Sequence, residues 1–102
     1  MKDNHAELTL DDICEAVELP PQTFIKLVEH GIVNPRGEQP TEWSFDLTMV
    51  STARKATRLR RDLKLSWSAV AIVVELIEER EQLLAQNEAL NQRLQRFLQD
   101  QE

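Results

Sequence analysis

The last third of the chain most constrains what it can fold into, because residues 67–99 contain neither glycine nor proline. Within this segment an apolar residue recurs every seven positions, at Leu76, Leu83, Leu90 and Phe97. This is the spacing of one core position of a coiled coil. The segment therefore predicts a single helix of roughly 50 Å, which is too long for a small globular head to cover.

The second core position of the same heptad is held by Val73, Arg80, Asn87 and Leu94. A seam asparagine costs stability but limits the register or the number of strands. An arginine in this row is poorly tolerated in a tight parallel dimer, so the strand orientation stays open. Since isolated helices are marginal in water, we expect the seam to be buried against a partner or, by default, a second copy. The expected dimerisation residues are Leu76, Leu83, Asn87, Leu90, Leu94 and Phe97.

Two short helices are predicted in the first part of the chain. Thr9 can cap the first helix, which has to stop before Pro20, and its apolar face is formed by Leu10, Ile13, Cys14 and Val17. Pro21 suits the first position of a second helix, and Gly31 ends it. Two short helices separated by about three residues form the skeleton of a helix-turn-helix.

The segment after Gly31 predicts a small β-hairpin wing. Its two candidate strands, residues 32–33 and 42–45, flank a turn-rich loop over residues 34–40. Asp46 is a suitable cap for a third helix over about residues 47–64.

These elements predict a mainly α-helical fold, in which a winged helix-turn-helix head with a small β-hairpin wing precedes a long helix that forms a coiled coil. We expect the head to span residues 1–66 and the C-terminal helix, residues 67–102, to act as the dimerisation element. No apolar stretch approaches the roughly 18 residues that a membrane span requires. The polar, acidic N-terminus has none of the features of a secretory signal, so a cytoplasmic protein is expected.

Charge is distributed unevenly, with a net value of −7 over residues 1–50, +5 over residues 51–72 and −4 over residues 73–102. An acidic head repels phosphate backbones, whose neutralisation supplies much of the non-specific affinity for DNA. The basic residues of the third helix are therefore expected to pair within the chain or with a protein rather than with phosphate. They are Arg54, Lys55, Arg58, Arg60, Arg61 and Lys64.

No arrangement of residues typical of catalysis or metal binding is present in the sequence. The spacing of the residues provides no nucleophile beside a base, no pair of convergent carboxylates and no cluster of metal ligands. The two histidines, His5 and His30, lie far apart, and the single cysteine, Cys14, lies in an apolar segment where core packing is its expected role. We therefore expect no enzyme, no metal and no cofactor.

Residues 8–70 resemble the head of MerR-type regulators, through a T-L-x-x-I opening, an H-G-I-V end to the second helix, a wing and a basic third helix. Recognition helices of that family typically carry arginines and tyrosines that grip the phosphate backbone, and residues 21–29 contain neither. Nearly the whole chain resembles the bacterial chaperone modulator family CbpM. The residues that carry this resemblance are Gly31–Arg36, the W-x-F-D of residues 43–46, and the R-L-R and L-x-W of residues 58–67.

The CbpM resemblance implies a regulator that binds the J-domain of a CbpA-like, DnaJ-family co-chaperone. It also implies inhibition of that co-chaperone's stimulation of DnaK and of its DNA binding. J-domains carry a basic helix, so an acidic surface could compete for it. The candidate contact residues are Asp11, Asp12, Glu15, Glu18, Arg54, Arg58 and Glu75. A homodimer with no direct DNA binding and no membrane association is expected.

Two alternatives remain open. In the first, the chain is a MerR-like transcription regulator whose dimer places two heads on DNA through the basic third helix. In the second, it is a structural coiled-coil subunit whose head has no ligand. Trp43, Phe45 and Trp67 are aromatic anchors by residue type, although core packing is the expected role of each.

Overall fold

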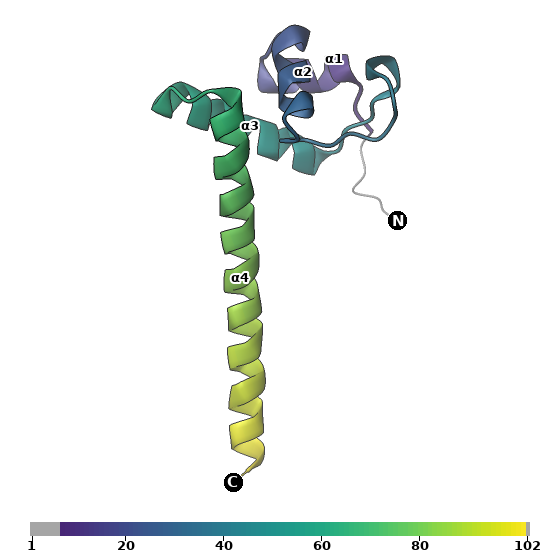
Figure 1. The fold of residues 1–102 in the computed structure, drawn as a ribbon. Helices are drawn as coiled ribbons and strands as arrows, with labels where there is room; N and C mark the ends of the chain where they lie inside the picture. Colours follow the sequence, from purple (N-terminus) through teal and green to yellow (C-terminus); the bar gives the residue numbers. More distant parts are fainter. Residues whose placement is uncertain (1–6, 102) are drawn as a thin grey trace. The chain divides into compact units, whose positions relative to one another are not determined.

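The computed structural model describes residues 7–101 of the chain. It divides into two compact units, Met1–Ile72 and Val73–Glu102, which are considered separately (Figure 1). In chain order the helices are α1 (Leu10–Val17), α2 (Pro21–Glu29), the 3₁₀ helix η1 (Pro40–Glu42), α3 (Leu47–Leu63) and α4 (Trp67–Asp100). The predicted mainly helical fold with a long C-terminal helix is confirmed.

Helix α1 begins at a capping box. The Thr9 hydroxyl accepts a hydrogen bond from the backbone N–H of Asp12 (3.1 Å), and the Asp12 carboxylate accepts one from the backbone N–H of Thr9 (3.0 Å). At the other end Glu18 adopts a left-handed conformation with φ of 59°. The N–H of the following residue, Leu19, then donates to the carbonyl of Cys14 (3.0 Å). This arrangement satisfies a C-terminal carbonyl of the helix.

The core of the first unit is built from α1, α2, the segment that precedes α3, α3 itself and the start of α4. Ile13, Phe24, Leu27 and Phe45 are fully buried. The rings of Phe24 and Phe45 meet edge to face with their centroids 5.4 Å apart, which is a favoured geometry for aromatic pairs.

Helices α3 and α4 both begin at side-chain caps. The Asp46 carboxylate accepts from the N–H of Met49 (2.9 Å), and the Ser66 hydroxyl accepts from the N–H of Ala69 (3.2 Å). Helix α3 turns Val50, Ala53 and Ala56 into the core and packs on α1. The two alanines leave room for a close approach of neighbouring backbone.

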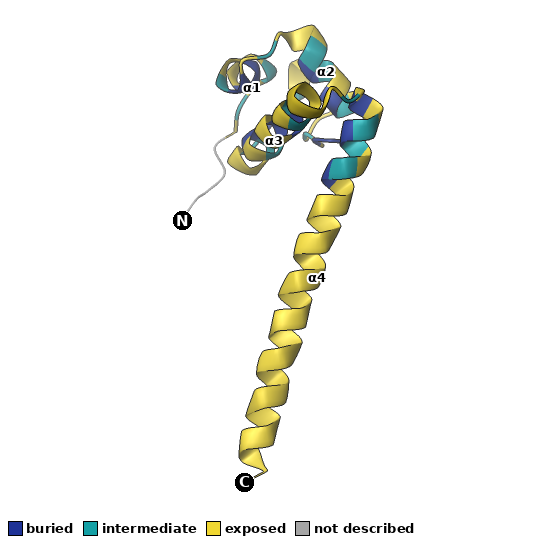
Figure 2. Ribbon diagram, turned by 90° about the vertical axis from the view of Figure 1, so that its left-hand side faces the viewer, coloured by how far each residue is buried: buried dark blue, intermediate teal, exposed yellow. Residues whose placement is uncertain are grey.

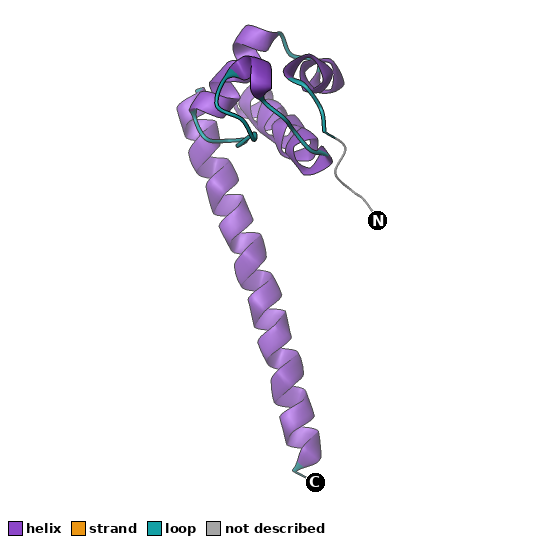
Figure 3. Cartoon of the chain, turned by 90° about the vertical axis from the view of Figure 1, so that its right-hand side faces the viewer, coloured by secondary structure: helices purple, strands orange, loops and turns teal. Residues whose placement is uncertain are grey.

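The predicted β-hairpin wing is wrong. Between α2 and α3 the described chain forms no strand (Figure 3). A single antiparallel bridge joins Arg36 to Ser44 through two N–H···O bonds of 3.1 and 2.9 Å. Helix η1 lies between the two bridged residues, where Pro40 lacks the N–H that a strand ladder needs. A second bridge joins Leu8 to Phe45 through two bonds of 2.8 Å, and no local pattern of residues indicates it.

The second unit contains the greater part of α4. Every residue from Glu75 to Gln101 is exposed (Figure 2). Among the residues that the structure describes, no helix combines the length and the apolar character that crossing a membrane would require.

Candidate protein-binding surfaces

The acidic surface of α1 contains four of the predicted contact residues, and all four are exposed. Asp12 is fixed by its capping bond to the N–H of Thr9, and Glu18 forms the left-handed end of the helix. Asp11 and Glu15 have no such local role. The spacing of Asp11, Glu15 and Glu18 aligns them along one side of α1. This side offers three carboxylates to a partner.

Arg54 of α3 joins the basic helix to the end of α1. Its Nη2 donates a hydrogen bond to the carbonyl oxygen of Ala16 (3.1 Å). A cationic side chain that binds a carbonyl of the last turn satisfies an acceptor and complements the helix dipole. Arg54 therefore has a structural role in addition to its predicted role in partner binding.

An open hollow lies between the end of α1 and α3. Glu18 forms part of its α1 wall, and Arg54, Arg58 and Arg61 form much of its α3 wall. The structure thus brings together three of the predicted contact residues, Glu18, Arg54 and Arg58. Asp11, Asp12 and Glu15 do not line this hollow, and Glu75 belongs to the second unit.

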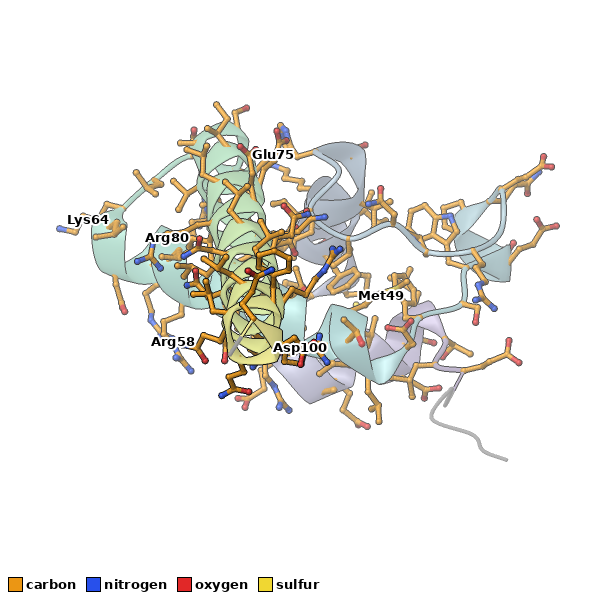
Figure 4. All side chains as sticks on the ribbon, turned by 90° about the horizontal axis from the view of Figure 1, so that it is seen from below. Met49, Arg58, Lys64, Glu75, Arg80 and Asp100 are labelled. Atoms are coloured by element: carbon orange, nitrogen blue, oxygen red, sulfur yellow. The ribbon has the colours of Figure 1, made fainter. Side chains whose placement is uncertain are left out.

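The basic residues of α3 do not pair with the carboxylates of α1. Among the described residues the ion pair formed is the one between Arg61 Nε and Asp62 Oδ1 (3.5 Å), whose side chains are both largely exposed. Such exposed pairs contribute little to stability. Arg60 instead places its guanidinium 4.7 Å from the centre of the Trp67 ring. The side chain of Arg58 extends away from α3 (Figure 4). The internal ion pairs expected from the sequence are therefore not formed with α1.

The aromatic side chains pack in the core or at its edge. Phe45 and Trp67 are buried, and Trp43 is half-buried with its ring edge to face with that of Phe45. Two apolar residues of α3 are exposed rather than turned into the core. Leu47 is 58% exposed and Leu63 is 59% exposed. The apolar spacing alone could not distinguish them from the buried members of the helix.

The predicted dimerisation residues form an exposed row on α4. More than half of the accessible surface of each apolar member is exposed, at Leu76, Leu83, Leu90, Leu94 and Phe97. Asn87 is exposed in the same row. A seven-residue spacing keeps these side chains on one side of the helix. This unit has no core of its own to bury them.

Cys14 is a buried core residue. Burial raises the pKa of its thiol, and the nearby Asp11 carboxylate raises it further. A raised pKa disfavours the thiolate, which is the form that attacks substrates and binds metals. Within residues 7–101 no group of three or more potential metal ligands occurs.

Comparison with known proteins gives the family. The family model described as "MerR HTH family regulatory protein" matches residues 8–92. The Chaperone modulatory protein CbpM of Pseudomonas entomophila is 41% identical over 93 residues, which cover 91% of this chain and 92% of that protein. The chain belongs to the CbpM family. The proteins of the same name from Pseudomonas putida strain W619 and Salmonella paratyphi A are 40% and 32% identical, over 91% and 88% of this chain and 92% and 89% of their own.

The family match covers the acidic side of α1 and most of the apolar row of α4. The family match includes α1, α2 and α3 completely, and it continues along α4 to residue 92. The resemblances to a MerR-type head and to the CbpM family are both confirmed. The names of the family model and of these relatives describe a regulatory protein and a chaperone modulator rather than an enzyme.

Proposed function

We propose that the chain is a non-enzymatic chaperone modulator that binds the J-domain of a CbpA-like co-chaperone. In this proposal, binding inhibits both the co-chaperone's stimulation of DnaK and its DNA binding. The observation that carries the proposal is the exposed acidic side of α1, formed by Asp11, Glu15 and Glu18. The names of the relatives support the chaperone-modulating role.

The charge of α1 suits a basic helix of the J-domain. None of the three carboxylates forms an ion pair with a described residue, so a partner would not have to displace a cation of the described part of the chain. Complementary surface charges speed association and disfavour partners of the wrong sign. A J-domain held in this way could not present its basic helix to DnaK.

A homodimer formed through the exposed row of α4 completes the proposal. The apolar row needs a partner of matching length, and a second copy supplies the same heptad. We propose residues 1–66 as the J-domain-binding head and residues 67–102 as the dimerisation element. Arg54, Arg58 and Glu75 are less specific candidates for polar contacts.

Calorimetric titration of the full chain with the J-domain of the CbpA-like protein tests the proposal. We expect saturable binding, and we expect the J-domain of DnaJ from the same organism to bind more weakly. The double variant Asp11→Lys/Glu15→Lys should bind about tenfold more weakly. Asp12 is left unchanged because its carboxylate caps α1.

A matched control places the same change of charge on the second unit. Glu81→Lys/Glu88→Lys substitutes two exposed residues of α4 that lie outside the apolar row, and we expect it to leave the affinity unchanged. Equal binding by the wild-type chain and the α1 double variant would remove this side of α1 from the interface. No binding to either J-domain, together with salt-sensitive binding to duplex DNA, would favour the MerR-like regulator instead.

A further inference from the structure

The outward side of α3 is a second surface whose charge is opposite to that of α1. Leu47, Ser51, Arg54 and Arg58 recur at spacings of four, three and four residues, so they lie along one side of the helix. We name these four residues the α3 stripe. It is apolar at its first residue and positively charged at its last two.

Two open hollows meet along the α3 stripe. One is lined by all four stripe residues together with Val50 and Lys55. The other lies between α3 and the end of α1 and shares Arg54 and Arg58 with the first. The two arginines therefore lie where the hollows meet, and a ligand in either one would contact both.

The charges of the stripe are available and partly preorganised. The hydrogen bond from Arg54 to the carbonyl of Ala16 fixes its side chain without neutralising its charge. Arg58 makes no ion pair with a described residue, whereas Arg61, at the far end of the helix, already contacts Asp62. Arg54, Lys55 and Arg58 thus form no ion pair with a described residue.

We propose that the α3 stripe binds an acidic helical segment of a protein, with an apolar side chain against Leu47 and carboxylates against Arg54 and Arg58. From Leu47 to Arg58 the stripe is roughly 16 Å long, which corresponds to three turns of a bound helix. Leu47, 58% exposed, gains from an apolar neighbour. This surface takes a ligand of the opposite charge to a basic J-domain helix, so the inference extends beyond the proposed function and does not depend on it.

A polypeptide fits the surroundings of the stripe better than a nucleic acid does. Glu18 lines the hollow that contains Arg58, and the chain carries a net charge of −6. A phosphate backbone that continued past the stripe would meet the carboxylate of Glu18, and it would leave Leu47 uncovered. A short acidic helix with one apolar residue covers Leu47 and does not have to continue beyond Arg58.

An NMR titration at low salt with a synthetic peptide tests the inference. The peptide is an alanine-based helix with a leucine near its start and a row of glutamates over the next three turns of the same face. It is added to the full-length, isotope-labelled chain. We expect saturable shifts of the backbone amides of α3, centred on residues 47–58. A peptide with glutamine in place of every glutamate should bind at least tenfold more weakly.

Two variants with matched controls locate the contact. Arg58→Glu should weaken peptide binding about tenfold or more, whereas Arg96→Glu on α4 should not. Leu47→Ser should weaken it about threefold to tenfold. Leu63→Ser is the control, because Leu63 is an equally exposed leucine of α3 that lies out of step with the stripe.

Several outcomes would overturn the inference. Absence of saturable shifts on α3 is one, and equal affinity of the wild-type chain and Arg58→Glu for the peptide is another. If the chain binds duplex DNA more tightly than the peptide, and Arg58→Glu abolishes the DNA binding, the stripe would be assigned to phosphate. If the chain self-associates and Arg58→Glu abolishes this association, the stripe would be assigned to a contact between two copies.

Discussion

Thr9 and Asp12 illustrate how much of the fold depends on single side chains. Their reciprocal hydrogen bonds to backbone N–H groups start α1. We expect Thr9→Ala to lower the free energy of unfolding by about 1 kcal/mol, because an N–H of the first turn loses its acceptor. Urea denaturation followed by circular dichroism measures the change. Thr41→Ala, at an exposed position of η1, should have less than half of that effect, and equal effects would contradict the capping role.

Cys14 should make the stability of the chain depend on pH in the alkaline range. Burial raises the pKa of its thiol above the ordinary value of 9.0, so the unfolded chain releases this proton at a lower pH than the folded chain does. The free energy of unfolding should therefore fall as the pH rises through and above 9.0. Denaturation at a series of pH values measures the fall. Cys14→Ala should show a smaller fall, whereas identical pH dependence in both proteins would contradict the assignment.

At the scale of the elements, the helices were predictable because their signals are local. Thr9, Asp46 and Ser66 each cap the helix that follows them, and Pro21 occupies the first position of α2. Such signals act within one turn of chain and need no knowledge of distant residues. The helix ends agree with the sequence-based boundaries to within about two residues for the same reason.

The backbone pairing of the segment between α2 and α3 was not predictable from the same kind of signal. Its single bridge and the bridge between Leu8 and Phe45 both depend on pairing across a loop or between distant segments. The bond from Arg54 to the carbonyl of Ala16 spans 38 residues, and nothing near either residue in the sequence indicates it. The hollow between α1 and α3 could therefore not be foreseen, although the charge of Glu18, Arg54 and Arg58 makes each of them a candidate for a polar contact.

The two glycines that flank and shape the loop before α3 should respond differently to substitution. Both have positive φ, 75° at Gly31 and 105° at Gly37. A Cβ at Gly31 would meet open space, whereas a Cβ at Gly37 would collide with the backbone carbonyl of Glu42. We expect Gly31→Ala to cost about 1 kcal/mol and Gly37→Ala to cost at least about 2 kcal/mol. Thermal denaturation compares the two variants, and a larger loss at Gly31 would contradict the close approach.

At the scale of the whole molecule, the two units are stabilised in different ways. The first unit buries its own core, including Phe24, Phe45 and Trp67. The second exposes every residue from Glu75 to Gln101, and a helix of this kind is marginal in water by itself. We therefore expect the helicity of α4 to increase with protein concentration, whereas the near-ultraviolet signal of the buried aromatic residues should not change. Circular dichroism of a dilution series of the protein separates the two responses, because the far-ultraviolet signal reports helicity and the near-ultraviolet signal reports the buried aromatic residues.

Self-association through α4 is the strongest expectation at this scale. Leu83→Asp/Leu90→Asp places two charges in the apolar row and should shift the chain to a monomer in sedimentation equilibrium. The control Gln92→Asp adds a charge to an exposed position of α4 outside the row and should leave the mass unchanged. Asn87→Leu should strengthen association but allow more than one oligomer size, because the seam loses its polar residue. If the wild-type chain stays monomeric at all concentrations, the apolar row of α4 does not bind a second copy and has to bind a different protein. The calorimetric titration would then have to show one J-domain bound to each monomeric chain.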